Sequence, residues 1–260
     1  IFDAELFFDG FKEKKEFALS CIKAAYDAGA RWVVLCDTNG GTLPDEIYNV
    51  VSEVVKVIPG QNVGIHAHND TDNAVANALA AINAGARQIQ GTINGLGERC
   101  GNTNLISLIP SLVLKTKYKT NISKDKLKNL IHISRTLNDI LNMPSRKNAP
   151  YVGDHAFSHK GGLHASAIEK NSSTYEHIEP EIVGNSRNVV ISNQAGRSNI
   201  LNQLNKINID LPKNEINSIL EIIKEKESEG YSFDTALAKA VSNEYPCLLY
   251  TSDAADDSIR

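Results

Sequence analysis

The residues best suited to chemistry are His66 and His68, which are separated by a single alanine in the segment His-Ala-His-Asn-Asp. His66 ends, and His68 closely follows, the segment 62–66, which predicts a β-strand. Side chains two residues apart on a strand project from the same face, so both imidazoles can reach one ion. Neutral imidazole is a good ligand for zinc, manganese, iron or cobalt. The pair therefore predicts a metal site; the alternative is two polar residues at a strand end, one of them capping a helix. Asn69 and Asp70 are expected to cap the next helix rather than to bind a ligand.

A glycine-rich loop, residues 94–102, follows the next predicted strand. Its three glycines let the backbone turn tightly or approach a ligand closely. Their spacing is not that of a dinucleotide-binding fingerprint. Asn102, at the end of the loop, has a side-chain carbonyl that can bind a metal, although its residue type alone favours an N-cap of the helix that follows.

Asp37 and Thr38 follow an apolar strand-like segment and begin a loop that contains two glycines. In an α/β barrel this is the end of the strand at which active sites lie, so both residues are placed to meet a small substrate. The alternative is a turn in which Thr42 caps the helix that begins near Pro44.

The segment 157–164 contains His159 and His164 on either side of two glycines. Such a segment can form a lid that carries an acid or base to a substrate. Taken alone, these histidines and the nearby Tyr175 are equally compatible with solvated side chains in a loop.

Four strand-then-helix units position these motifs. The expected strands are 1–4, 32–36, 62–66 and 88–93, and the expected helices are 14–28, 44–58, 72–83 and one between 101 and about 110. The sequence Ala-Gly-Ala-Arg at 28–31 recurs at 84–87, where a helix gives way to a strand in both cases. A doubly wound sheet and a (β/α)8 barrel both fit, and four units are half of such a barrel.

The domain organisation expected from these patterns has four parts. Residues 1–117 form the second half of a (β/α)8 TIM barrel, and 118–154 form a helix and a linker. Residues 155–245 form a mainly helical subdomain that carries the lid, and 246–260 have the composition of a non-native tail.

Composition narrows the possible partners of the 260-residue chain. A net charge of −4 and the lack of a lysine or arginine run argue against nucleic acid. No segment has the roughly 18 apolar residues that a membrane helix needs. The four cysteines are scattered without a Cys-x-x-Cys pair, which indicates reduced thiols in a cytoplasmic protein.

Taken together, the motifs resemble those of the 2-isopropylmalate/homocitrate/citramalate synthase family, over residues 1 to about 241. The matching segments are His-x-His-Asn-Asp, Gly-Leu-Gly-Glu-Arg-x-Gly-Asn, His-x-Gly-Gly-x-His at 159–164 and Tyr-Glu-x-Ile-x-Pro-Glu-x-Val-Gly at 175–184. The resemblance implies a divalent metal (Mg, Mn, Zn or Co) held by His66, His68 and Asn102. In the family a further aspartate ligand comes from the first barrel strand, which this sequence lacks.

The resemblance also implies roles for the other candidates. His164 and Tyr175 would reach the active site of the partner subunit in a homodimer and assist proton removal from acetyl-CoA. Glu98 would organise the glycine-rich loop and belong to the catalytic set. Asp37, Thr38 and His159 would contact substrate.

The activity implied is a Claisen condensation of acetyl-CoA with a 2-oxo acid. The sequence looks most like the branch that uses pyruvate and gives (R)-citramalate and CoA, on a route to isoleucine. The alternatives are a 2-isopropylmalate synthase of leucine biosynthesis and a metal-dependent lyase or aldolase of the HMG-CoA lyase type. We expect the chain to be an N-terminally truncated fragment that binds metal weakly and is inactive alone.

Overall fold

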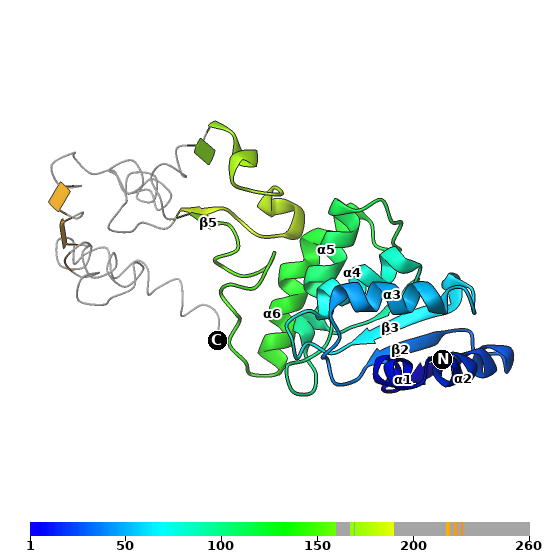
Figure 1. The fold of residues 1–260 in the computed structure, drawn as a ribbon. Coiled ribbons are helices and arrows are strands. Elements are labelled where there is room, and N and C mark those ends of the chain that lie inside the picture. The colour runs from blue at the N-terminus through cyan, green and yellow to red at the C-terminus, as the bar shows by residue number, and fades with distance from the viewer. Residues whose placement is uncertain (160–166, 169, 190–216, 219–220, 223–224, 226–260) are drawn as a thin grey trace. The chain divides into compact units, whose positions relative to one another are not determined.

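The computed structural model describes residues 1–159, 167–168, 170–189, 217–218, 221–222 and 225 (Figure 1). The chain forms two compact units, one of residues 1–153 and 182–185 and one of residues 154–181 and 186–260. Most of the predicted helical subdomain, His164 and the predicted tail 246–260 lie outside the described residues. No helix in the described part of the chain is long and apolar enough to cross a membrane.

The first unit is built on a parallel four-stranded sheet. Its strands are β1 (Phe2–Ala4), β2 (Val33–Asp37), β3 (Val63–Ala67) and β4 (Gln88–Gln90), and they pair in the order β1-β2-β3-β4. Asp3 pairs with Val34, Cys36 with His66 and His66 with Gln90. A doubly wound sheet reverses its strand order at a switch point, whereas a barrel does not. The uninterrupted order is therefore the one expected for part of a barrel.

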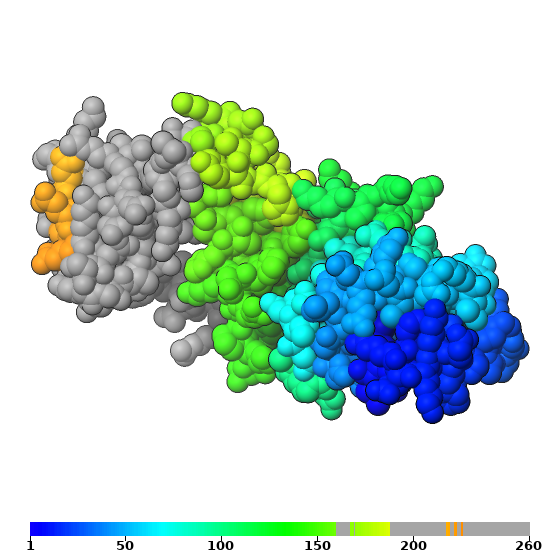
Figure 2. All heavy atoms as spheres, in the orientation of Figure 1, coloured from blue at the N-terminus to red at the C-terminus, as the bar shows by residue number. Residues whose placement is uncertain are grey.

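Helices connect these strands in sequence (Figure 1). They are α1 (Phe7–Glu13), α2 (Lys15–Asp27), α3 (Pro44–Val54), α4 (Ala74–Ala84) and α5 (Leu105–Lys115), followed by η3 (Lys124–Asn129) and α6 (Leu130–Ile140). Short 3-10 turns, η1 (Gly60–Asn62) and η2 (Ile93–Gly95), precede β3 and follow β4. Figure 2 shows the N-terminal segments of this unit, coloured blue to cyan, lying side by side.

Two of the predicted helix ends were wrong, and one helix was not predicted. Helix α1 was not predicted, and α3 ends at Val54 rather than at residue 58. Helix α5 continues past Pro110, which lacks the N–H that an interior helical residue donates. Burial of Leu108 and Leu112 against Ala78 and other residues of α4 stabilises this helix on both sides of the proline.

One face of the sheet forms the core. Val33 and Leu35 of β2 and Val63 and Ile65 of β3 alternate with residues of the opposite face and pack against α1 to α4 in one buried cluster. Because side chains alternate across a strand, Cys36, His66 and Gln90 project from the other face. The chemistry-bearing face is thus supported from behind by the helices.

The sheet curls toward the face that carries His66. Gln90 Nε2 donates to Asp3 Oδ1 at 2.8 Å, although β4 and β1 occupy the two ends of the strand order. Strands in a flat sheet are about 4.8 Å apart, so three spacings would separate β1 from β4 by about 14 Å. Two side chains of this length do not meet across that distance unless the sheet is strongly curved, as it is in a barrel.

The second unit is described only in part. It contains the two-residue strands β5 (Ser158–His159) and β6 (Asn188–Val189), which pair in parallel. The 3-10 turn η4 (Ser172–Thr174) follows β5 and precedes β6 in the sequence. A further 3-10 turn, η5 (Pro180–Val183), begins in the second unit, and its last two residues are counted with the first unit.

Candidate metal centre

The structure brings His66, His68 and Asn102 together at the carboxyl end of β3. His66 Nε2 lies 2.9 Å from Asn102 Nδ2, and the two imidazole rings are 5.1 Å apart between centroids. Residues 68 and 102 also form an isolated antiparallel β-bridge. The three side chains predicted to hold a metal therefore converge, although Asn102 lies 34 residues beyond His68 in the sequence.

The glycine-rich loop folds back onto β3 through backbone hydrogen bonds. Asn69 N donates to Gly101 O at 2.8 Å, and Thr103 N donates to Ala67 O at 3.1 Å. A Cβ atom at Gly97 would lie 1.8 Å from Asn102 Oδ1, so only glycine leaves room for the amide there. These contacts hold Asn102 beside the histidines. Asn102 is not the N-cap of α5; that residue is Asn104, whose side chain accepts from Ile106 N.

Gly101 tests how far the loop backbone positions Asn102. Its φ is +92°, and a Cβ atom there would lie 1.9 Å from Gly95 O. We expect Gly101→Ala to destabilise the chain by more than about 1 kcal/mol, because alanine is strained at positive φ. The matched control is Gly10→Ala in α1, where a Cβ atom meets nothing within 4 Å, and which should stabilise by about 0.5–1 kcal/mol. Urea unfolding followed by circular dichroism measures both, and equal effects would contradict the proposed constraint.

The donor set suits a divalent cation. His66 Nδ1 lies 2.7 Å from Gln90 Oε1, which can only accept a hydrogen bond, so Nδ1 carries the proton and Nε2 keeps its lone pair. His68 Nδ1 is buried and has no hydrogen-bond partner among the described residues. Burial, followed by the nearby His66 and Arg99, lowers the pKa of His68 and favours the neutral imidazole that binds metals.

Oxygen and nitrogen of the Asn102 amide exchange places on rotation by 180°, which would direct the carbonyl oxygen to the same point as His66 Nε2. The described residues contain no cluster of three or more histidine, cysteine, aspartate or glutamate side chains placed around one point. The set offered by this chain is therefore two imidazoles and one amide. Both are ligand types that zinc, manganese and related ions accept.

Arg99 connects the loops that follow β2, β3 and β4 beside the candidate metal ligands. Its guanidinium forms a two-point ion pair with Asp70, with Nε at 2.7 Å from Oδ1 and Nη2 at 3.0 Å from Oδ2. Nη2 also donates to Thr38 O at 2.8 Å. Arg99 lowers the pKa of Asp70, which stays ionised. The prediction that Asp70 caps the next helix was wrong, because Arg99 binds its carboxylate; Asn69 Oδ1 does accept from Ala74 N at the start of α4.

Unusual backbone conformations concentrate on the same loops. Four residues on the segments that follow the strands have positive φ although they are not glycine: Leu6, Asp72, Asn94 and Arg99. Such conformations are uncommon and are found where surrounding contacts enforce them, often at functional sites. Hydrogen bonds with Ser134 and Asn138 of α6 hold Asn94 in place. They connect the glycine-rich loop to this helix.

The side chain of Asp37 points away from this centre, although its backbone carbonyl accepts from His68 N at 3.4 Å. Its side chain projects from the same face as Val33 and Leu35, is fully buried, and accepts from Thr42 Oγ1 at 2.7 Å. Burial raises its pKa, which the hydrogen bonds from Thr42 partly offset. The geometry therefore gives no support to a direct contact of Asp37 with substrate. It also explains why Thr42 does not cap α3, whose N-cap is Leu43.

Thr38 directly follows β2 and begins the loop at the carboxyl end of that strand. Its hydroxyl donates to Glu5 Oε2 at 2.7 Å and accepts from Leu6 N at 2.8 Å. The neighbouring thiol of Cys36 has a pKa raised to about 12, first by burial and then by Glu5 and Asp3. A thiol with that pKa is not a nucleophile at neutral pH.

Glu98 is exposed and does not contact the histidines directly. Its side chain keeps 85% of its surface in solvent and lies 3.8 Å from the guanidinium of Arg99. Its carbonyl accepts from Gly101 N at 2.8 Å, so the loop is organised by the backbone of Glu98. The described structure gives its carboxylate no catalytic contact.

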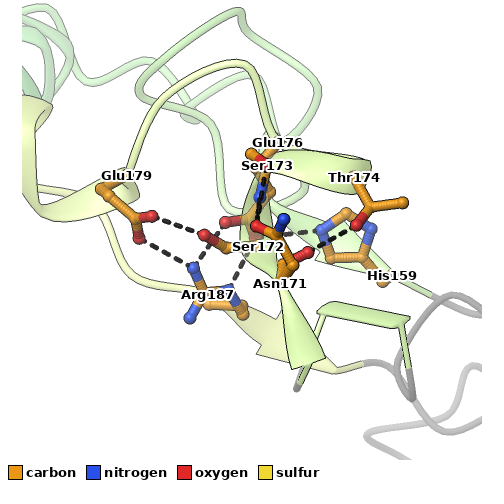
Figure 3. Close-up of polar contacts among 8 residues, drawn as sticks. All are labelled: His159, Asn171, Ser172, Ser173, Thr174, Glu176, Glu179 and Arg187. Carbon is orange, nitrogen blue, oxygen red and sulfur yellow. Dashed lines mark hydrogen bonds and ion pairs between the residues drawn. The ribbon is translucent and has the colours of Figure 1, made fainter.

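In the second unit, His159 belongs to a polar cluster around the buried carboxylate of Glu176 (Figure 3). Its Nε2 lies 3.2 Å from Glu176 Oε1, and Arg187 forms a two-point ion pair with the same carboxylate at 2.7 and 2.5 Å. Arg187 is the main cause of the lowered pKa of Glu176. The adjacent Tyr175 is exposed. His164, which was predicted to act together with Tyr175, lies outside the described residues.

Sequence reasoning missed Gln90, Asp3 and Arg99. The alternation Gln88-Ile89-Gln90 did indicate a strand with one polar face. It did not indicate that the side chain of Gln90 contacts Asp3 of β1 across the sheet.

Two family models match consecutive parts of the chain. The HMGL-like family model matches residues 5–136, and the model described as homocitrate synthase post-HMGL domain-like matches residues 151–230. The chain is 54% identical to the (R)-citramalate synthase of Aquifex aeolicus, over 92% of this chain and 45% of that protein. It is 47% identical to the (R)-citramalate synthase of Sulfolobus acidocaldarius, over 93% and 46%.

A more distant relative is the 2-isopropylmalate synthase of Sulfolobus acidocaldarius, at 34% identity over 90% of this chain and 60% of that protein. The chain spans about half the length of these (R)-citramalate synthases.

Proposed function

This chain belongs to the HMGL-like family, a family of TIM-barrel enzymes, and we propose that it serves the condensation of acetyl-CoA with pyruvate to give (R)-citramalate and CoA. The observation that carries the proposal is the convergence of His66, His68 and Asn102 at the carboxyl end of β3. Relatives named (R)-citramalate synthase, at 43–54% identity, support pyruvate as the 2-oxo acid. The four described strands are half of a (β/α)8 barrel, so we assign the activity to the whole protein.

The chemistry of the condensation explains the donor set. A divalent cation would act as a Lewis acid on the keto group of the 2-oxo acid and stabilise the charge that develops there. His66 and His68 would supply the nitrogen ligands, and the curled sheet places them on the face opposite the core. Arg99 holds the loops after β2, β3 and β4 at fixed positions, which keeps Asn102 beside the imidazoles.

Proton removal from the methyl group of acetyl-CoA is assigned to the second unit. We propose that Tyr175 and His164 assist this step in the active site of the partner subunit of a homodimer. Glu176 and Arg187 hold His159 in the same unit, where it can contact substrate. Attack of the resulting carbon on the keto carbon, followed by thioester hydrolysis, releases CoA. A cytoplasmic location fits the free thiols of Cys21, Cys36 and Cys100.

The proposal is tested in a chimera. Residues 1–240 replace the matching segment of the Aquifex aeolicus (R)-citramalate synthase, which is 54% identical over 240 residues. CoA release is measured as free thiol with acetyl-CoA, a divalent metal, and pyruvate, 2-oxoisovalerate or 2-oxoglutarate in turn. We expect release with pyruvate.

Preference for 2-oxoisovalerate in this assay would keep the chemistry but identify a 2-isopropylmalate synthase. No release with any 2-oxo acid from a folded, metal-loaded chimera would contradict the proposal. Cleavage of a 3-hydroxyacyl-CoA by the same chimera would then identify a lyase.

A further inference from the structure

We propose that Gln90 is a positioning residue that fixes His66 as the tautomer able to bind a cation, and that Asp3 fixes the direction of the Gln90 amide. The three side chains form one chain of hydrogen bonds across the sheet: His66 Nδ1 to Gln90 Oε1 at 2.7 Å, and Gln90 Nε2 to Asp3 Oδ1 at 2.8 Å. The inference rests on the proposed metal site and deepens it.

Donor and acceptor roles leave only one arrangement of this chain. The carboxylate of Asp3 can only accept, so the amide NH2 of Gln90 must face it. The carbonyl of Gln90 then faces His66 and can only accept, so His66 Nδ1 must carry the proton. The lone pair is left on Nε2, the atom that lies 2.9 Å from Asn102. One carboxylate on β1 thus determines which nitrogen of a histidine on β3 is free.

The arrangement matches a recurrent feature of metal sites. A histidine that binds a metal usually donates its other N–H to a carboxylate or carbonyl, which fixes the ring and its tautomer. Here an amide is placed between the carboxylate and the imidazole. Because Asp3 and Gln90 lie on the two outermost of the four described strands, the same contact also depends on the curvature of the sheet. Curvature and ligand geometry are therefore coupled.

The tautomer is measured on the metal-free 260-residue chain by histidine 15N NMR, with His66 assigned by its alanine variant and the pH kept above the usual histidine pKa of about 6.5. We expect wild-type His66 to be protonated on Nδ1 alone, and Gln90→Leu to give a mixture of tautomers. The matched control is Gln88→Leu, two residues away on the same strand and face, which should leave His66 unchanged. Wild-type His66 protonated on Nε2, or no change in Gln90→Leu, would overturn the proposal.

Asp3→Asn tests the role of Asp3 separately. An asparagine can face the Gln90 amide with either its oxygen or its NH2, so the direction of Gln90 is no longer fixed. We expect a mixture of His66 tautomers in this variant. In Asp3→Asn combined with Gln90→Glu, a carboxylate faces His66 and one donor again faces one acceptor at each contact, so His66 should be protonated on Nδ1 alone. The wild-type tautomer in Asp3→Asn alone, with native circular dichroism, would contradict the role of Asp3.

Zinc affinity of the chimera, measured by competition with a chromophoric chelator, gives a second readout. Loss of such a supporting contact typically costs about 10- to 100-fold in metal affinity, and we expect that loss in the Gln90→Leu chimera. Unchanged affinity in this variant would overturn the proposal. A parent chimera that binds no zinc, together with the expected His66 tautomer in the 260-residue chain, would count against the proposed function and leave the role of Gln90 supported.

Discussion

Replacing His66 and His68 together by alanine should abolish pyruvate-dependent thiol release by the chimera. Loss of a contact that merely orients a ligand costs about 10- to 100-fold, so loss of two ligands should exceed 100-fold. The described site offers no third imidazole beside Asn102 that could replace them. The measurement pairs initial rates with metal content after gel filtration, and both should fall together.

The matched control is His132→Ala. His132 lies on α6 and is exposed, so this variant removes an imidazole without touching the centre. Its rate and metal content should equal those of the parent chimera. Full activity in the double histidine variant would contradict the assignment of the site, and equal losses in the two variants would indicate nonspecific damage.

Arg187→Ala should strongly destabilise the described part of the second unit. The side chain of Glu176 is 2% exposed, so the variant leaves a buried carboxylate without its strongest partner. Removing one partner of a buried pair costs about 3–5 kcal/mol. Hydrogen exchange of backbone amides in residues 171–187 reports the local free energy of opening, which should fall accordingly.

Glu179→Ala supplies the control for this prediction. Glu179 contacts the same guanidinium at 3.1 Å, but its side chain is 55% exposed, so its loss should cost about 0–1 kcal/mol. Glu176→Gln combined with Arg187→Ala removes the unpaired charge and should recover part of the loss. Equal protection in Arg187→Ala and wild type would show that the cluster does not stabilise this unit.

The same cluster predicts an acid-sensitive stability. Arg187 holds the pKa of Glu176 below its ordinary value of 4.5 in the folded state. The unfolded chain therefore takes up the proton first, and the stabilisation is complete above pH 4.5 and is lost as the pH falls toward the lower folded pKa. Wild-type protection should decrease over this range, and Arg187→Ala should lack that part of the profile.

Much of the barrel-like half could be predicted because its signals are local. The apolar run of β2 and the repeated Ala-Gly-Ala-Arg segments mark strands and their entries without reference to distant residues. The spacing of His66 and His68 likewise follows from the two-residue period of a strand. Helix ends were less predictable, because several polar residues competed for each capping position: Asn104 caps α5 where Asn102 was the alternative, and Thr42 binds Asp37 instead of capping α3.

The contacts that complete the centre depend on the curvature of the sheet and on loop paths. Gln90 and Asp3 lie 87 residues apart, and their contact exists only because β1 and β4 approach each other across the curled sheet. Arg99 reaches Asp70 and Thr38 from a loop whose φ values are unusual. No periodicity or motif encodes such contacts. The one feature of the sequence that pointed to Gln90 is the polar residue at every second position of β4.

Anomalous diffraction from crystals of the zinc-loaded chimera with pyruvate tests directly whether His66, His68 and Asn102 hold the metal. We expect one zinc peak about 2.0–2.1 Å from a ring nitrogen of both His66 and His68, with His66 binding through Nε2 and Asn102 beside it. A zinc peak bound elsewhere, or His66 and His68 free of metal in an active, zinc-loaded chimera, would contradict it.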